Sequence, residues 1–511
     1  MMVDSQRKTT FAYVLFAMAF VMVLLPSVLA ATTASTGRNG RPAYPVDQQI
    51  PIGSPFGVCH GELENNTIIA QSAIAQTGMA WNRKDFPWSY FQPVPTDNFT
   101  RITDPNDYYQ KFIANMTTLG IKMLPILDYG VWWLDPNGWY IPPANISRWQ
   151  QFVHAAVTEY QDRMQLWEVW NEPNNQYGND KGTWEDFFLV LITAARTIKL
   201  VNDSLDVLVG GLGGTREFEF LEALMKNLTG TPANVPGYAT AKELFVGIAF
   251  HPYNGVPEDL AYSLSRYDEI LSRYNWTTRH GARHWITEIG GETDDPEDGT
   301  GGFLVDPQRE LATMVIKQAT IATTWRVDGL IWYEYRDDNP PGVFTSDFGH
   351  MGIIFNDGTW KPAAHAWNWT NKFLGNGHVD MMPVPLPDSI TGLVAKDQQL
   401  YDGLERWIVV AWNPRHHGAV QTSIQFTTSI VKAMLYDHAS THSVQVTPAG
   451  NTMIIDVGHE PVLLVVDCAP GSSCTFVACL DLLGGLFWML LGGSAMLVGL
   501  VVVVSTLRRN A

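Results

Sequence analysis

The chain has 511 residues, enough for about two or three folded domains. Its 51 acidic side chains outnumber its 33 basic ones, and the resulting formal net charge of -18 argues against a nucleic-acid partner because such a surface repels phosphate. Aromatic residues make up 12% of the chain, which excludes extensive disorder, and four cysteines are too few for a disulfide-built scaffold.

The first 30 residues have the pattern of a secretory signal peptide. Arg7 and Lys8 precede an apolar block over 11–30, which closes with small residues suited to cleavage before Ala31. Because the apolar stretch is long, an uncleaved signal anchor is the alternative interpretation. Residues 31–50 are expected to form a linker.

A second apolar segment, over 480–507, is predicted to be a transmembrane helix. Residues 482–507 carry no charged side chain, and at ~1.5 Å per residue they can cross a ~30 Å hydrocarbon layer. Arg508 and Arg509 begin a short tail over 508–511 that is expected to stay in the cytoplasm. The pattern predicts a single-pass type I membrane protein, at the cell surface or in a secretory or lysosomal lumen. The alternative is a lipid-anchor signal at Gly471-Ser472-Ser473.

Eight N-glycosylation sequons agree with this topology, because all of them lie between the two apolar segments. They begin at Asn65, Asn98, Asn115, Asn145, Asn202, Asn227, Asn275 and Asn368. N-linked glycans are therefore expected. A stalk is predicted over 468–479, where Cys468 and Cys474 are candidates for a disulfide pair.

Short apolar runs recur along 51–375, most of them roughly 40 residues apart, the length of one strand, one helix and two loops. They lie at 56–58, 80–81, 121–127, 165–170, 206–209, 245–250, 284–287 and 328–333. Helix-period segments separate them, among them 147–160 with Ser147 as its cap, 184–200, and 308–325 opened by Pro307. Eight such units predict an α/β protein with a (β/α)8 TIM barrel, and an open doubly wound sheet is the alternative.

The pattern changes after the predicted barrel. Over 376–467, short alternating runs are separated by Gly, Pro, Asn and Asp, which is typical of a small antiparallel β-sandwich. No cluster of carboxylates or histidines stands out there, so this domain is expected to support the barrel.

Two carboxylates follow predicted strands that lie across the barrel from each other. Glu172 ends the fourth strand and Glu288 the seventh, at the carboxyl ends where a parallel barrel places its working groups. A side-chain period of two puts Trp170 on the face of Glu172, and Ile286 on the face of Glu288. Glycosidic bond cleavage needs one carboxyl whose pKa is raised, so that it donates a proton, and one ionised carboxylate. The alternative for each Glu is a helix cap or a surface ion pair.

Three motifs at the predicted strand ends make the sequence resemble the catalytic barrels of glycoside hydrolase clan A. They are Asn171-Glu172-Pro173 at the fourth strand, His251-Pro252-Tyr253 at the sixth and Thr287-Glu288 at the seventh. The string over 168–174, with Gly210-Gly211 at the fifth strand, is most similar to family 39 and neighbouring families. The resemblance extends from residue 54 to about residue 467, since clan members often carry a sandwich after the barrel.

The resemblance implies a retaining O-glycosidase that uses no cofactor and no metal. Glu172 would be the acid/base and Glu288 the nucleophile, with carboxyl groups ~5 to 5.5 Å apart. Substrate contacts are implied for Asn171, His251, Tyr253 and Trp332, the last as an aromatic floor for the sugar. Arg83 would favour the ionised nucleophile, and its alternative is an ion pair on an exposed loop.

Position alone suggests the remaining candidates. Asp128 and Trp132 follow the third strand, where a carboxylate can bind hydroxyls and an indole can stack on a sugar, and Glu334 ends the eighth. Glu168 is a rival acid, but four residues deeper along its strand it is expected to be a satisfied core carboxylate. The expected substrate is an oligosaccharide, polysaccharide or glycoconjugate. The alternative function is a catalytically inactive or weakly active carbohydrate-binding protein of the cell surface.

Overall fold

The computed structural model describes residues 54–478 apart from 62–73, 178–181, 215, 254–255, 277–282, 292–305, 341–348, 376, 378, 383–385, 387–388 and 415–418. The predicted signal peptide, linker, transmembrane helix and cytoplasmic tail lie outside the described residues. Within the described part of the chain, no helix has the length and apolar character needed to cross a bilayer.

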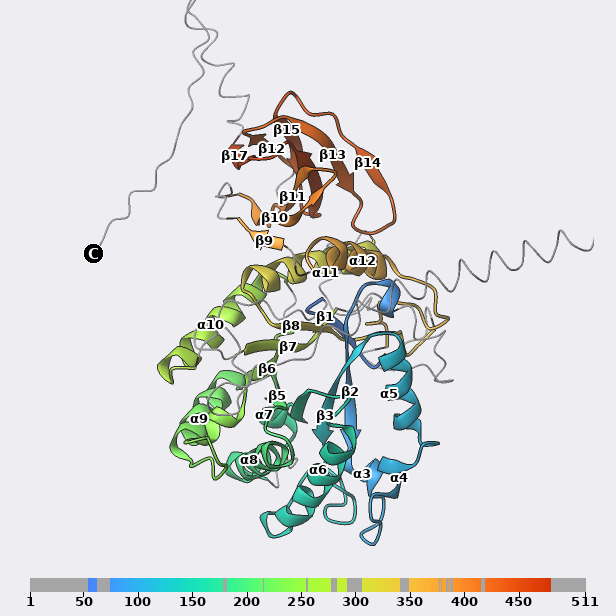
Figure 1. Ribbon diagram of the computed structural model, residues 1–511, viewed down its shortest axis with the longest axis vertical. Coiled ribbons are helices and arrows are strands. Elements are labelled where there is room, and N and C mark those ends of the chain that lie inside the picture. Colours follow the sequence, from blue (N-terminus) through green and yellow to red (C-terminus); the bar gives the residue numbers. More distant parts are fainter. Residues whose placement is uncertain are drawn as a thin grey trace, which may run out of the picture.

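Eight parallel strands form a closed barrel in chain order, as the sequence predicts (Figure 1). The first strand closes it, since Gly57 pairs with Trp81 on one side and with Ile331 on the other. The strands are β1 (Phe56–Cys59), β2 (Trp81–Pro87), β3 (Lys122–Asp128), β4 (Leu166–Asn171), β5 (Asp206–Gly213), β6 (Gly247–His251), β7 (Arg283–Ile289) and β8 (Gly329–Trp332). Every strand therefore has two neighbours, and no edge is left open.

The helices begin where the local sequence supplies a cap. Thr183 and Asp186 form a capping box at the start of α8, and Asp306 caps α11, whose first residue is Pro307. The prediction for Ser147 is wrong, because a 3-10 turn leads directly into α6 and Ser147 lies inside the helix. The helical segments are α3 (Trp88–Phe91), α4 (Thr100–Thr103), α5 (Tyr108–Thr118), η2 (Pro143–Asn145), α6 (Ile146–Tyr160), α7 (Pro173–Gln176), α8 (Trp184–Val201), α9 (Glu217–Gly230), η3 (Ala241–Leu244), α10 (Asp259–Arg273), α11 (Pro307–Thr324) and α12 (Pro362–Phe373).

Apolar side chains fill the part of the barrel nearer the amino ends of the strands. A buried cluster inside it includes Trp81 and Trp285, whose rings meet edge to face at 5.0 Å, with Leu124, Leu166, Leu208 and Ile331. Arg83 and Glu168 lie two residues further along their strands than Trp81 and Leu166. The interior thus changes from apolar to charged towards the carboxyl ends of the strands, and only that end is suited to chemistry.

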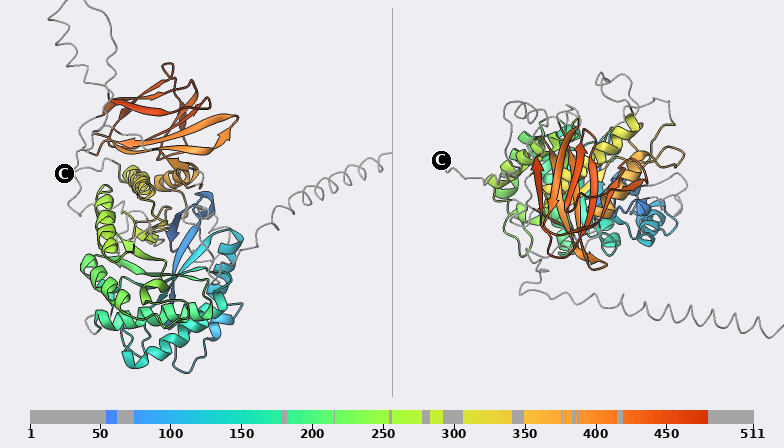
Figure 2. Two further views of the ribbon diagram at one scale, coloured as in Figure 1. Left: turned by 60° about the vertical axis from the view of Figure 1, so that its left-hand side comes forward. Right: turned by 90° about the horizontal axis from the view of Figure 1, so that it is seen from above.

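The second domain is an antiparallel sandwich of a six-stranded and a three-stranded sheet (Figure 2). Its strands are β9 (Val379–Met381), β10 (Thr391–Tyr401), β11 (Leu404–Trp412), β12 (Val420–Phe426), β13 (Ile430–Tyr436), β14 (Ser443–Gln445), β15 (Thr452–Val457), β16 (Val462–Cys468) and β17 (Cys474–Ala478). The sequence did not predict β9 or β17. Because β17 pairs with β12, residues 474–478 belong to the sandwich and not to a stalk. Cys468 and Cys474 both carry free thiols in its core, so the suggested disulfide is absent here.

The sandwich rests on helices α11 and α12 of the barrel (Figure 1). Arg309 of α11 donates to both carboxylate oxygens of Glu460 at 2.6 Å and to Asp437 at 3.1 Å. The indole N–H of Trp369 in α12 donates to the carbonyl oxygens of Asp437 and Ser440. These contacts hold the sandwich in a defined position against the barrel.

Candidate active site

A left-handed residue near the end of β4 places two consecutive side chains at the barrel mouth. Trp170 has φ 71°, and the ladder to β5 skips one pair between Val169 and Asn171. Trp170 is buried in the helical layer against Trp149 and Phe187 instead of facing the mouth with Glu172, which corrects the expected alternation. Glu172 is also left-handed, with φ 45°.

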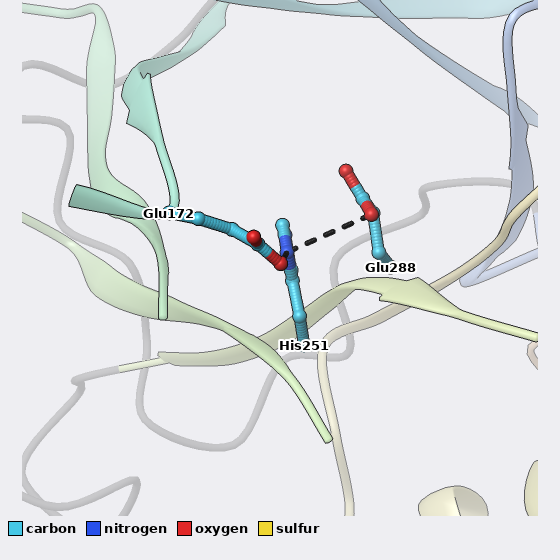
Figure 3. Close-up of side chains that lie close together, drawn as sticks. All are labelled: Glu172, His251 and Glu288. Carbon is cyan, nitrogen blue, oxygen red and sulfur yellow. Dashed lines mark hydrogen bonds and ion pairs between the residues drawn. The ribbon is translucent and has the colours of Figure 1, made fainter. Parts of the chain in front are cut away.

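A similar irregularity occurs in β7. The register against β8 shifts between Ile286 and Ile289, and both Thr287 and Glu288 make contacts inside the barrel. Ile286 packs in the outer cluster, so it does not share the face of Glu288 as predicted. Glu172, after the left-handed Trp170, and Glu288, at the register shift of β7, lie towards each other across the mouth (Figure 3).

Arg83 joins the two halves of the site. Its guanidinium is 1% exposed and donates to Glu168 through Nε at 2.8 Å and Nη2 at 2.9 Å, and to Glu288 Oε1 through Nη1 at 2.5 Å. Nη2 also donates to Asn171 Oδ1 at 2.9 Å. Arg83 is therefore not part of an exposed loop. It places a positive charge directly against the Glu288 carboxylate.

Glu168 is a satisfied core carboxylate, as expected. It is fully buried and accepts hydrogen bonds from Arg83, from the backbone N–H of Gly211 at 2.9 Å and from the Thr287 hydroxyl at 3.3 Å. Its oxygens are therefore occupied as acceptors inside the barrel, which leaves Glu172 as the candidate acid at the mouth.

His251 connects Glu172 to this buried network. Its Nδ1 lies 3.0 Å from Glu172 Oε1, and its Nε2 lies 3.1 Å from Thr287 Oγ1. Since the Thr287 hydroxyl donates its one proton to Glu168, its oxygen accepts from His251 Nε2–H. The Nδ1 atom is then free to accept a proton from a protonated Glu172, or to donate one to an ionised Glu172.

The pKa of Glu172 differs in direction from the sequence prediction. Burial acts to raise this pKa, as expected, but the hydrogen bond and charge of His251, together with Asn175 and Arg83, outweigh burial, and the net shift is downward. The reason is that the expected neighbour was another carboxylate, whereas the nearest group is an imidazole. Glu172 and His251 are therefore best treated as one pair that shares a proton.

Glycines on β5 leave room for this pair. A Cβ at Gly211 would lie 1.9 Å from His251 Nε2, and one at Gly213 would lie 2.6 Å from Glu172 Oε1. The Gly210-Gly211 motif thus has a steric cause, because any larger side chain at residue 211 would displace the imidazole.

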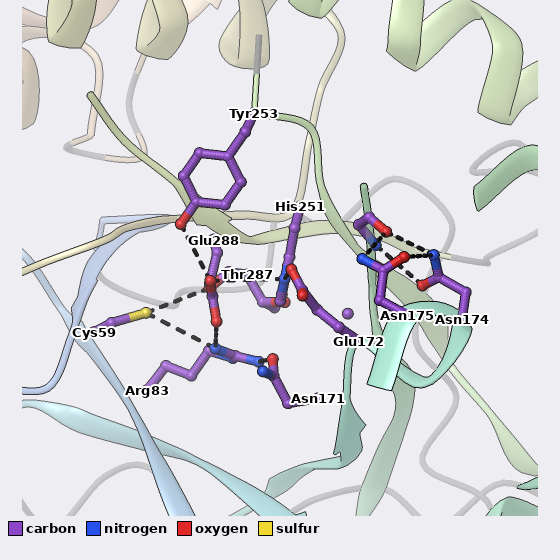
Figure 4. Close-up of polar contacts among 12 residues, drawn as sticks. Cys59, Arg83, Asn171, Glu172, Asn174, Asn175, His251, Tyr253, Thr287 and Glu288 are labelled. Carbon is purple, nitrogen blue, oxygen red and sulfur yellow. Dashed lines mark hydrogen bonds and ion pairs between the residues drawn. The ribbon is translucent and has the colours of Figure 1, made fainter. Parts of the chain in front are cut away.

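Tyr253 contacts the other carboxylate. Its hydroxyl donates to Glu288 Oε2 at 3.1 Å (Figure 4). The residue as a whole is 42% exposed, but the hydroxyl points into the site, where burial and the Glu288 carboxylate raise the pKa of Tyr253. Tyr253 is thereby kept as a neutral donor to Glu288.

The structure does not place the two predicted tryptophans beside the carboxylates. Trp332 faces outwards into the helical layer, where it packs against Trp367 and donates its indole N–H to the Met351 carbonyl. The prediction for Trp332 is wrong because Ile331 occupies the interior face of β8, and the next inward side chain is Tyr333. Trp132 is 58% exposed and donates to the Pro93 carbonyl, so its stacking role stays a prediction.

Asp128 and Glu334 belong to a second polar group at the mouth. Asp128 is fully buried beside Asp85, and neither of its carboxylate oxygens has a hydrogen-bond donor among the described residues. Burial and the Asp85 charge raise the pKa of Asp128 well above its usual range. His60 lies between Asp85 and Glu334, 3.6 Å from a carboxylate oxygen of each.

Sequence reasoning missed His60, Asp85, Thr287 as a hydrogen-bonding residue, and Tyr333. Asp85 had a usable signal, since it shares the strand parity of Arg83 and lies one pleat nearer the rim. His60 had none, because it follows β1 in a left-handed conformation with φ 55° that no local motif indicates.

Glu172, His251 and Glu288 together could in principle ligate a cation. One ligand atom from each lies within 4.8 Å of the others. However, Glu288 already accepts from Arg83 and Tyr253, and a cation there would adjoin the guanidinium. Repulsion from Arg83 makes this donor set a poor metal site and a suitable proton-transfer site.

Several solved structures with similar folds are glycoside hydrolases. A family 39 glycoside hydrolase from the gut symbiont Bacteroides cellulosilyticus WH2 has a TM-score of 0.61 and 20% identity, over 82% of this chain and 82% of that one. A monomeric β-xylosidase from Caulobacter crescentus CB15 has a TM-score of 0.54 and 15% identity, over 83% and 97%. The fold is that of clan A.

A further clan A neighbour is the catalytic domain of a family 30 xylanase C from Talaromyces cellulolyticus, with a TM-score of 0.53 and 14% identity over 82% of this chain and 98% of that one. No family model matches the sequence. No curated protein matches it either. The clan A fold is thus shared with chains of 20% identity or less, and the likeness concerns architecture.

Proposed function

We propose that this protein is a retaining glycoside hydrolase that cleaves O-glycosidic bonds with Glu172 as acid/base and Glu288 as nucleophile. The observation that carries the proposal is the separation of the two side chains, whose nearest oxygens lie within 4.8 Å. Retaining enzymes hold their carboxyl groups ~5 to 5.5 Å apart, whereas inverting enzymes need ~6.5 to 9.5 Å to admit a water.

In the first step, Glu288 attacks the anomeric carbon while Glu172 protonates the departing oxygen. Arg83 orients Glu288 through one carboxylate oxygen, and Tyr253 orients it through the other. The proton that Glu172 delivers belongs to the Glu172–His251 pair, so His251 can keep Glu172 supplied although the pKa of Glu172 is lowered.

In the second step, water attacks the glycosyl ester of Glu288. Glu172, now ionised, takes the proton from that water, and this restores the proton that the Glu172–His251 pair gave to the leaving group. Asn171 is held by Arg83 at the rim, where its amide can meet a sugar hydroxyl next to the reacting carbon. Two inversions at that carbon give net retention.

Trapping of the intermediate tests this proposal. A 2-deoxy-2-fluoro glycosyl fluoride should add one sugar mass to a peptide containing Glu288, because the fluorine slows release of the ester. Proton NMR of early product should show the anomer of the substrate. Labelling of Glu172, or product of the opposite anomer, would contradict the assignment. If the folded protein binds oligosaccharides but is not labelled by the fluoro sugar and hydrolyses no substrate, the inactive carbohydrate-binding alternative is favoured instead.

We also propose that the protein is a type I membrane glycoprotein whose barrel faces the exterior or a lumen. Seven of the eight sequon asparagines lie in the described part of the chain, and none of these seven is buried there. Removal of N-glycans by an endoglycosidase should increase electrophoretic mobility, and protease added to sealed vesicles should leave the barrel intact. Unchanged mobility together with full digestion would contradict this topology.

A further inference from the structure

A wall of polar side chains continues from the proposed catalytic pair around the barrel mouth. Tyr333, after β8, interacts with both Glu288 and Glu334. The His60 ring, after β1, meets the Tyr333 ring edge to face at a centroid distance of 5.4 Å. His60 then contacts Asp85 on β2, 3.6 Å from its carboxylate. We call Asp85, His60, Tyr333 and Glu334 the acidic wall.

The acidic wall presents polar atoms that the proposed bond cleavage does not use. The side chains of His60 and Asp85 are 31% and 28% exposed, so they line the opening. Glu334 is 4% exposed, and its Oε1 has no hydrogen-bond partner among the described residues. Asp128 lies behind Asp85, and its carboxyl group interacts with that of Asp85. An unpaired buried carboxylate oxygen is costly unless a ligand supplies a donor.

The charges of the acidic wall determine which sugar it accepts. Burial acts to lower the pKa of His60, but Asp85 and Glu334 raise it to about 10, so His60 is an imidazolium that offsets one carboxylate. Arg83 is occupied by Glu168 and Glu288, and the Lys84 charge lowers the pKa of Asp85 without Lys84 belonging to the wall. Among the described residues of the wall, no cation is left to pair with an anionic ligand.

We propose that the acidic wall binds the hydroxyl groups of an uncharged sugar and excludes uronic acids and sulfated sugars. The inference rests on the proposed function, because it assigns the glycone of the same site. Carboxylates accept hydrogen bonds from sugar hydroxyls, and the His60 N–H groups can donate to a hydroxyl oxygen. A uronate would instead place its charge beside Asp85 and Glu334 in a partly buried setting, where like charges repel strongly.

The test uses pairs of aryl glycosides that differ only at C6. The full-length protein is assayed with 4-nitrophenyl glucoside against glucuronide, and with galactoside against galacturonide, in both anomeric forms. We expect kcat/KM of the neutral member to exceed that of its uronide by roughly 100-fold or more. A uronide cleaved within tenfold of its neutral partner, or faster, would overturn the inference while supporting a glycosidase.

Two variants distinguish a specific role of Asp85 in sugar recognition from a general loss of activity. Asp85→Asn keeps the shape but removes one charge, and it should lower kcat/KM for the neutral glycoside by roughly tenfold while narrowing its advantage over the uronide. Asp338→Asn is the matched control, because Asp338 is exposed after β8 and close enough to raise the pKa of Glu334 without belonging to the wall. It should leave the ratio within about threefold. An unchanged ratio in Asp85→Asn would overturn the inference.

Saturation-transfer NMR measures binding of the same glycosides independently of their cleavage. It therefore distinguishes a failure of this inference from a failure of the proposed function. A neutral glycoside that binds in an Asp85-dependent manner but is never cleaved would support the acidic wall and reject hydrolysis. If neither member of any pair binds, the inference fails.

Discussion

Thr287 is a positioning residue whose hydroxyl sets the protonation of the Glu172–His251 pair. It accepts from His251 Nε2 and donates to Glu168, so the proton at Nδ1 is the one shared with Glu172. Thr287→Val keeps the volume but lets the imidazole exchange tautomers, which should reduce kcat/KM by roughly 10- to 100-fold and shift the basic limb of its pH profile.

The matched variant for Thr287 is Thr287→Ser, which retains the hydroxyl and should restore both the rate and the pH profile. A merely structural role would alter the thermal stability in Thr287→Val without moving the limb. Equal pH profiles in the two variants would therefore contradict the tautomer argument.

His60 and Asp85 form an ion pair with a defined pH range. The folded pKa of His60 is raised from 6.5 to about 10, so its stabilisation is complete below about pH 6.5 and is lost as the pH rises through about 10. Burial acts to raise the pKa of Asp85, but His60 and Asp128 lower it, so Asp85 stays ionised over that whole range. His60→Gln should lower the free energy of unfolding by about 1–2 kcal/mol at pH 6, after allowance for its partial exposure, and by much less at pH 10.5.

Urea unfolding of the two proteins at both pH values measures the His60 difference directly. A loss of equal size at pH 6 and pH 10.5 would mean that the imidazolium charge contributes nothing and that only packing was removed.

At the scale of elements, strand β5 makes room for the site because its glycines have no side chains. Gly211 lies against the imidazole of His251, where a Cβ would approach Nε2 to 1.9 Å. Gly211→Ala should therefore displace His251 and lower kcat/KM by roughly 100-fold, with a smaller effect on thermal stability. Gly230→Ala, at the end of α9 where no atom lies within 4 Å of a built Cβ, is the control and should change neither. Wild-type activity in Gly211→Ala would show that His251 is dispensable.

The left-handed Trp170 in β4 and the register shift in β7 explain why simple alternation failed there. Asn171 and Glu172 both reach the mouth because Trp170 turns into the helical layer, where its indole is more stable than beside charges. Thr287 and Glu288 do the same on β7. Each irregularity brings one additional polar side chain to the mouth, and it interrupts the regular pairing with the neighbouring strand.

At the scale of the whole molecule, the sandwich buttresses the side of the barrel formed by α11 and α12. Trp369 of α12 packs against Tyr436 at a ring distance of 4.7 Å and donates to two carbonyl groups of the sandwich. Trp369→Ala should lower the free energy of unfolding by about 2–3 kcal/mol, because the interface loses both packing and hydrogen bonds. It touches none of the site residues, so KM should not change.

The contrast for Trp369 is Trp132→Ala, which removes an exposed indole from the loop after β3 and should cost less than about 0.5 kcal/mol. Calorimetry of both variants measures the stabilities. If Trp369→Ala has the same unfolding temperature as the wild type, the contacts of Trp369 with the sandwich do not contribute to stability.

The sequence by itself determined the repeating strand–helix plan, the change to a sandwich, and the positions of Glu172 and Glu288 at strand ends, because hydrophobic periodicity and strand order are local properties. It also indicated Arg83 and His251 through their motifs. Only the tertiary structure decided that Arg83 bridges Glu168 and Glu288, that Trp332 faces away from the mouth, and that His60 joins Asp85 to Glu334. Those relations depend on how the barrel closes and on where a strand is irregular. Local periodicity carries no information on either feature, because both follow from packing between residues far apart in the chain.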